Sequence, residues 1–131
     1  MDRDRFEKGM EVRKAVLSPE YVEASLARAD DFTRPLQELV TEFCWGAVWG
    51  RDGLERKTRS LINIAMIGAL GRNHELELHV GGAFRNGVTE EEIQEVVLQV
   101  AVYCGFPAAI DTMRTAKAAI EKFKVAEAEG K

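Results

Sequence analysis

Apolar residues recur at spacings of three and four along almost the whole chain, which is the period of an α-helix. The clearest example begins at Thr89, where the Thr89 hydroxyl and the Glu92 carboxylate can form a capping box. The helix that follows carries apolar residues at helical spacing: Ile93, Val96, Val97, Val100, Ala101 and Cys104. No segment shows the alternation of a strand bounded by hairpin turns. The pattern therefore predicts an all-α protein.

Caps, prolines and glycines divide this pattern into helices joined by short links. Ser18 followed by Pro19 is typical of a helix start, and Thr33, with a proline in the first turn after it, marks another. Gly71 and Gly87 stand where helices should end, because glycine readily adopts the left-handed conformation of a C-terminal cap. We expect a bundle of about seven helices, with approximate spans 4–16, 19–29, 34–48, 54–70, 73–85, 90–104 and 107–128.

The same pattern predicts which helical surfaces are buried. Residues 61–70 leave little polar face, so this helix should lie in the interior. Helix 4–16 has sparse apolar positions and should be an exposed amphipathic helix. Cys44 and Cys104 lie on apolar stripes, where a free cysteine usually acts as a small hydrophobe. The last helix should turn four apolar side chains inward, namely Ile110, Met113, Ile120 and Phe123.

Composition narrows the class of protein. A length of 131 residues predicts one domain, 1–131, and 46% hydrophobic with 31% charged residues is typical of a globular chain. The net charge of −4 argues against a nucleic-acid or anionic-membrane partner. The N-terminus has no apolar stretch typical of a signal peptide, and no apolar run has the length of about 20 residues that spans a membrane. We expect a cytoplasmic protein without nucleic-acid or membrane partners.

The segment from His74 to His79 resembles a zinc-protease helix but fails its geometry. That motif needs two histidines four residues apart on one helical face. Here they are five apart, which rotates the second about 140° from the first. We therefore expect no metal site in this segment.

His79 is the better candidate for chemistry. It is predicted in mid-helix, one turn after Glu75, so that the two side chains share a face. Apolar and glycine neighbours place it at the edge of the apolar stripe rather than in open water. Gly81 and Gly82 weaken a helix interior, which suggests close approach of a helix or ligand. The pattern is compatible with a structural histidine paired with Glu75 and with a functional group.

A second candidate feature is the segment from Trp45 to Arg51, which holds both tryptophans of the chain. Two large rings, small residues between them and an arginine after them could line a pocket mouth. They could equally be interface anchors. Four arginines could each bind a carboxylate through two hydrogen bonds, namely Arg51, Arg59, Arg72 and Arg85, although a solvated ion pair is the commoner fate of an arginine.

Several motifs together resemble the carboxymuconolactone decarboxylase family over about residues 35–125, with the helices of residues 4–29 preceding this core. The decarboxylase branch is indicated by the segment Trp45–Trp49 with Arg51, Gly53 and Leu54. The shared helical core is indicated by TRSL at 58–61, ALGR at 69–72, ELELHV at 75–80, AFRNGVT at 83–89, EIQEV at 92–96 and VYCGFPAA at 102–109.

The resemblance extends to alkylhydroperoxidase-like members of the family, but the residues of their thiol chemistry are absent. Their paired cysteines would fall at Arg72 and Glu75, and the glutamate of their proton relay at Ser60. A peroxidase that acts through a thiolate cannot work without one. The absence of these residues counts against the alkylhydroperoxidase-like members and does not affect the resemblance to the decarboxylase branch.

The resemblance implies an all-helical subunit that assembles as a homo-oligomer, a trimer or a hexamer. It also implies decarboxylation of 4-carboxymuconolactone to the β-ketoadipate enol-lactone, in protocatechuate catabolism. The lactone ring accepts the electrons released by the departing carboxylate, so no cofactor is expected. The alternatives are a family member acting on another small organic acid or lactone, a thiol-type peroxidase, and a non-catalytic helical oligomer.

Under this resemblance His79 is expected to donate the proton, and Glu75 to orient it or tune its charge. Arginines suit a dianionic substrate, with Arg51 as the first carboxylate ligand and Arg72 or Arg59 as the second. Trp45 and Trp49 are expected to form the wall of the pocket and to keep water out.

Overall fold

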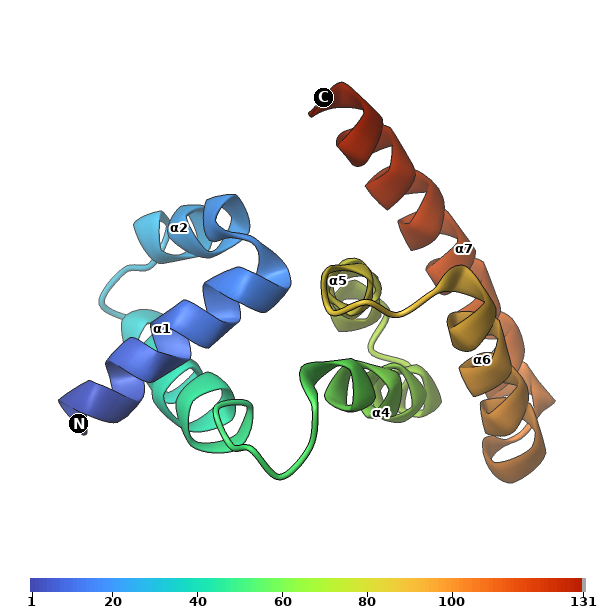
Figure 1. Ribbon diagram of the computed structural model, residues 1–131, viewed down its shortest axis with the longest axis horizontal. Helices are drawn as coiled ribbons and strands as arrows, with labels where there is room; N and C mark the ends of the chain where they lie inside the picture. Colours follow the sequence, from blue (N-terminus) through green and yellow to red (C-terminus); the bar gives the residue numbers. More distant parts are fainter. Residues whose placement is uncertain (131) are drawn as a thin grey trace. The chain divides into compact units, whose positions relative to one another are not determined.

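The computed structural model describes residues 1–130. The chain forms two compact units, Met1–Arg56 and Lys57–Lys131 (Figure 1). We call these unit 1 and unit 2. Over the described residues the chain has seven α-helices, one π-helical segment and no strand, which confirms the predicted all-α fold. The single-domain organisation and the homo-oligomer stay predictions. No helix in this part of the chain is long and apolar enough to cross a membrane.

Unit 1 is built around its first helix. This helix packs against the π-helical segment and against the second helix, and its valines, Val12 and Val16, are fully buried. The predicted amphipathic character is confirmed, because the few apolar residues form one buried stripe and most other residues of the helix are exposed, although the helix is more central to its unit than expected. The elements of unit 1 are α1 (Arg3–Leu17), α2 (Pro19–Ala27), α3 (Arg34–Leu39) and η1 (Val40–Val48).

The π-helical segment η1 replaces the second half of the helix expected from Thr33 to the loop at Gly50. Its wider turn is visible at its end, where the Trp49 N–H donates to the Cys44 carbonyl five residues earlier, at 2.9 Å. Thr33 stands at the start of α3 but makes no side-chain cap; its hydroxyl and backbone amide bind Asp30 instead. The sequence carries no signal for the change of helix type.

Glycines allow α1 and η1 to lie in close contact. A Cβ built at Gly9 overlaps the Thr41 carbonyl, and one at Gly46 overlaps the Arg5 carbonyl. Both neighbours are helical backbone, which cannot rotate away as a side chain can. Close packing of this pair therefore requires glycine at both positions.

We predict that Gly9→Ala destabilises unit 1. Forcing a methyl group into a packed interface typically costs about 1–3 kcal/mol, which lowers Tm by roughly 4–15 °C in a chain of this size. Thermal unfolding followed by circular dichroism measures the change. Gly53→Ala is the matched control, because a Cβ there meets nothing within 4 Å. Equal Tm values for the two variants would contradict the close contact.

Unit 2 contains four helices around a core that includes Ile64, Leu76, Val80, Ile93 and Val97, all of them almost completely buried. The helices are α4 (Arg56–Leu70, which begins at the last residue of unit 1), α5 (Asn73–Arg85), α6 (Glu90–Cys104) and α7 (Phe106–Glu129). The long α7 packs against both α5 and α6. Local signals predicted these bounds to within about two residues.

The predicted capping box at the start of α6 is confirmed. The Thr89 hydroxyl accepts from the Glu92 backbone N–H at 3.1 Å, and a Glu92 carboxylate oxygen accepts from the Thr89 backbone N–H at 2.9 Å. This hydrogen bond from the Thr89 backbone and the nearby Lys57 ammonium lower the pKa of the Glu92 carboxyl. The link to Lys57, at 3.0 Å, joins the start of α4 to the start of α6.

The predicted burial of residues 61–70 is wrong for most of this helix. In α4 only Ser60, Ile64 and Gly68 are buried, whereas Ile62, Met66 and Leu70 are 40%, 51% and 71% exposed. The reason is geometric, since a unit of four helices covers one face of each helix. The same reason leaves three other side chains exposed that were predicted to lie inside, namely Cys104, Ile110 and Met113.

Candidate functional site

His79 lies in the middle of α5 and is 8% exposed. Leu76, Val80 and Ala83 form the fully buried stripe of this helix, and His79 stands beside that stripe. This confirms the expectation that the imidazole is not in open water. Burial lowers the pKa of His79 below its ordinary value of 6.5, and the negative charge of Glu75 acts in the opposite direction.

Glu75 stands one turn earlier, in the first turn of α5, and is exposed. Its carboxylate acts on His79 through charge, raising the pKa of the imidazole. Arg72 precedes α5 at the N-cap position, is also exposed and makes no side-chain cap. The structure therefore places both residues at the exposed N-terminal end of the helix that carries His79.

Asn63 is a residue of this site that sequence reasoning did not single out. It comes from α4, and its side-chain Nδ2 lies 3.5 Å from His79 Nδ1. One signal could have found it, since Asn63 is the one polar side chain in the apolar run 61–70. A half-buried amide in such a run needs a partner, because burying an unpaired polar group is unfavourable.

Arg59 stands on α4 four residues before Asn63, so the two are neighbours on the helix surface. The side chain is half-buried, and its Nε atom is buried without a hydrogen-bond partner among the residues the structure describes. A buried guanidinium N–H with no partner can donate a hydrogen bond to an oxygen atom of an anionic ligand. Unit 2 thus holds a desolvated imidazole, an amide beside it and a guanidinium on the adjacent turn of α4.

Trp45 and Trp49 belong to unit 1. Their ring centroids are 4.9 Å apart with a 31° tilt, and both rings are part of the core of that unit. Trp49 also lines a pocket of about 280 Å³, whereas Trp45 is not among its lining residues. The other residues at this pocket are Lys8, Gly50, Arg51, Asp52, Leu54, Glu55 and Arg56.

Arg51 is exposed at this pocket of unit 1, which contains three cationic and two acidic side chains. Such a mixture can bind a carboxylate, with an apolar contribution from Trp49. Of the seven residues predicted for the site, unit 1 holds Trp45, Trp49 and Arg51. Unit 2 holds the other four, Arg59, Arg72, Glu75 and His79. Their roles stay predictions.

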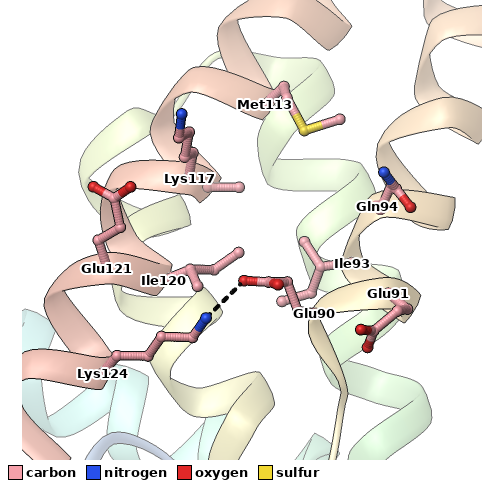
Figure 2. Close-up of a pocket in the computed structure, with 10 residues that line it drawn as sticks. Glu90, Glu91, Ile93, Gln94, Met113, Lys117, Ile120, Glu121 and Lys124 are labelled. Atoms are coloured by element: carbon pink, nitrogen blue, oxygen red, sulfur yellow. Dashed lines mark hydrogen bonds and ion pairs between the residues drawn. The ribbon is translucent and has the colours of Figure 1, made fainter.

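A pocket of about 440 Å³ in unit 2 lies between α6 and α7 (Figure 2). Its lining includes the apolar residues Ile93, Met113 and Ile120, and a Glu90–Lys124 ion pair of 3.1 Å links the two helices (Figure 2). None of the predicted site residues lines it. Within residues 1–130 no group of three or more His, Cys, Asp or Glu side chains is placed to hold a metal ion.

The chain is similar to known decarboxylases. The sequence model of the carboxymuconolactone decarboxylase family matches residues 34–118. The chain is 53% identical over 113 residues to nitrosuccinic acid decarboxylase of Metarhizium robertsii, which covers 86% of this chain and 79% of that protein. It is 41% identical over 125 residues to 4-carboxymuconolactone decarboxylase of Acinetobacter baylyi, which covers 95% of this chain and 93% of that protein.

Proposed function

The chain belongs to the carboxymuconolactone decarboxylase family, and on this premise we propose that it removes CO₂ from a small dicarboxylic acid that carries its own electron sink. The similarity to two named decarboxylases with different substrates is the observation that carries this proposal. The two substrates look unlike each other, but their reacting carbons share two substituents and each is connected to an electron acceptor.

In nitrosuccinic acid and in 4-carboxymuconolactone, one carbon bears both the carboxylate that can be lost and a CH₂–COO⁻ arm. When the carbon–carboxylate bond breaks, its electron pair needs an acceptor. The nitro group takes it directly as a nitronate, and the lactone carbonyl takes it through the ring double bond as an extended enolate. Because each molecule stabilises its own carbanion, the protein has to bind the anionic substrate and to supply a proton.

We propose 4-carboxymuconolactone as the first candidate substrate. The identity with the Acinetobacter protein extends over nearly the full length of both chains, and the segment Trp45–Trp49 with Arg51 resembles the decarboxylase branch. Nitrosuccinic acid is the second candidate, favoured by the higher identity with the Metarhizium protein over a shorter alignment. The alternative of another small organic acid or lactone stays within the same chemical class.

In this proposal the imidazolium of His79 donates the proton. For the lactone the proton goes to the ring carbon next to the carbonyl, and for the nitro acid to the carbon that lost CO₂. The neutral imidazole then regains a proton from water. Glu75 supports this role because its negative charge favours the protonated form of His79, which burial disfavours.

Among the arginines, Arg59 is the favoured carboxylate ligand of unit 2. Its half-buried guanidinium has a buried, unpartnered Nε, whereas Arg72 is exposed to solvent. A hydrogen bond to a charged group is stronger where water competes less. Arg51 is retained as a proposed carboxylate ligand at the pocket of unit 1, with Trp49 as an apolar wall and Trp45 packed behind it.

The proposal predicts CO₂ release from at least one of the two candidate substrates, with kcat unchanged after treatment with a chelator. 4-Carboxymuconolactone is generated in situ from β-carboxymuconate by a lactonising enzyme, and nitrosuccinic acid is added directly. CO₂ release is measured for both substrates, and kcat/KM ranks them. A protein that is folded by circular dichroism and turns over neither substrate would contradict the proposed function.

A further inference from the structure

The helices α6 and α7 form a hairpin with a row of large apolar side chains that unit 2 leaves exposed. Only Gly105 separates the two helices, and an ion pair links Glu90, at the start of α6, to Lys124, near the end of α7, so they are antiparallel neighbours (Figure 1). On each helix the exposed apolar residues recur at spacings of three and four, which places them on one face. These residues are between 38% and 68% exposed, namely Leu98, Val102, Phe106, Ile110 and Met113. We call these five residues the hairpin face.

The pocket of about 440 Å³ between the same two helices continues the hairpin face. Gln94 of α6 and Met113 of α7 both line this pocket (Figure 2). Leu98 stands about one turn after Gln94 on α6. Ile110 stands about one turn before Met113 on α7. One apolar surface therefore extends from the pocket to the end of the hairpin, where Phe106 lies.

The hairpin face has the size of one half of a stable protein–protein interface. Its exposed fractions correspond to roughly 500 Å² of surface, and apolar patches of this size on a single chain are often functional. At the apolar content of about 65% that homodimer interfaces have, this surface belongs to a contact of about 800 Å² per chain. Each partner in a standard stable interface buries about that area.

We propose that a second copy of this chain covers the hairpin face, with Phe106 of each copy seated in the α6–α7 pocket of the other. Phe106 is 66% exposed at the first position of α7. Pockets of about 300–1,000 Å³ hold whole small ligands, so a pocket of about 440 Å³ has room for a phenyl ring. The pairing goes beyond the proposed decarboxylation and does not depend on it.

A twofold axis makes both of these contacts at once. In a contact of this symmetry, residue i of one copy meets residue j of the other, and the reverse also holds. Lys117 stands near the middle of the α7 side of the pocket, and it follows Phe106 by about 16 Å along the helix. The axis therefore passes midway, between Ile110 and Met113, at the centre of the hairpin face.

The charges around the pocket favour a second copy over a small charged ligand. The pocket lining contains acidic and basic side chains together, among them Glu91, Glu121 and Lys117. A lining with charges of one sign would favour a ligand of the opposite charge. Charges of both signs beside an apolar centre are suited to the polar rim of a contact between two copies.

Sedimentation velocity over a dilution series tests the pairing with the full chain and without substrate. The parent protein should form particles with an even number of chains. Phe106→Glu should halve the particle mass, because a carboxylate cannot replace a phenyl ring against apolar walls. The variant should stay folded, since an acidic side chain is favourable in the first turn of a helix. Phe32→Glu is the matched control, because Phe32 is 92% exposed in unit 1 and the same change there should leave the particle mass unaltered.

The particle masses decide whether the hairpin face pairs with itself. A mass that is halved in Phe106→Glu and unchanged in Phe32→Glu supports the pairing. A parent protein that stays a monomer throughout the series would overturn it, and the hairpin face would then bind a different partner. An equal loss of mass in both variants would also overturn it, because the effect would not be specific to the hairpin face. Circular dichroism confirms that each variant is folded.

A second measurement reports on the pocket itself. The chain has four methionines, so the ε-methyl signal of Met113 can be identified in a ¹³C NMR spectrum by its loss in Met113→Leu. Within one chain Phe106 stands about 10 Å from Met113 along α7, too far for its ring current to act on this methyl group. The phenyl ring of the second copy should shift the signal upfield. Phe106→Leu keeps an apolar side chain and the assembly but should remove the upfield shift. A Met113 signal that is the same in the parent protein and in Phe106→Leu would overturn the seating of Phe106 in the pocket.

Discussion

Replacing His79 by glutamine is expected to lower kcat by ~10²-fold or more, because a positioned proton donor contributes that much to a step limited by proton transfer. Glutamine has a similar reach and keeps a polar group beside Asn63, so the fold should survive. It has no proton to release near neutral pH. Steady-state kinetics on the better of the two candidate substrates measures the effect.

The control for this change lies on the same helix. His74 is exposed near the start of α5, and His74→Gln should leave kcat within about twofold, as is usual for a surface change away from the chemistry. Circular dichroism and Tm show whether either variant has lost its fold. A folded His79→Gln variant with the parent rate would mean that the proton comes from another group.

The pH dependence of the same reaction follows from the burial of His79. Its pKa is lowered from 6.5, and the imidazolium is the proposed donor, so kcat/KM should be highest at acidic pH. It should fall as pH rises through the depressed pKa. Glu75→Gln removes the charge that raises this pKa, so the falling limb should move to lower pH. A rate that rises with pH over this range would instead indicate a neutral His79 acting as a base.

Lowering the pH is expected to raise kcat/KM but to lower the stability of the folded protein. Because the folded pKa of His79 lies below the unfolded value, the unfolded chain binds this proton more readily. The stabilising contribution is complete above pH 6.5 and is lost as pH falls through the folded pKa. Profiles at acidic pH therefore need a parallel measurement of Tm, in which His79→Gln should lose less stability than the parent protein.

The fold was predictable where the signals are local. The bounds of α5 and the capping box of Thr89 and Glu92 depend on residues within a few positions of each other. Burial was predicted less well, because it depends on which face of a helix meets a neighbour. Met66 illustrates this, since its helix is apolar on most sides but unit 2 covers only one of them.

At the candidate site, too, local features could be predicted from the sequence and tertiary contacts could not. The position of His79 beside a buried stripe follows from the spacing of Leu76, Val80 and Ala83 along one helix. Its contact with Asn63 could not be predicted, because the partner comes from another helix and nothing in the spacing specifies which residues of α4 and α5 meet. For the same reason, the sequence could not separate Arg59 from Arg72, which differ in burial and not in residue type.

Replacing Arg59 by alanine is expected to lower kcat/KM by roughly 10–100-fold, the effect of losing one hydrogen bond between a charged ligand and a partly buried donor. The guanidinium is half-buried and its Nε has no hydrogen-bond partner within residues 1–130, so a substrate carboxylate would satisfy a group that the protein leaves unsatisfied. Arg59→Lys should recover only part of the loss, because an ammonium provides charge without the planar pair of donors.

Alanine variants of other arginines show whether the loss of kcat/KM in Arg59→Ala comes from the half-buried position of Arg59 or from the loss of a positive charge alone. Arg114 on α7 is exposed and paired with Asp111 at 3.2 Å. Arg114→Ala therefore removes one positive charge at a residue for which no role in the site is predicted. It should change kcat/KM by less than about twofold. If Arg72→Ala matches the loss in Arg59→Ala, both arginines bind substrate. If Arg72→Ala alone is impaired, the exposed end of α5 holds the carboxylate and the assignment to Arg59 is wrong. A loss confined to Arg59 would mean that the half-buried guanidinium of Arg59 is the group that binds the dianion.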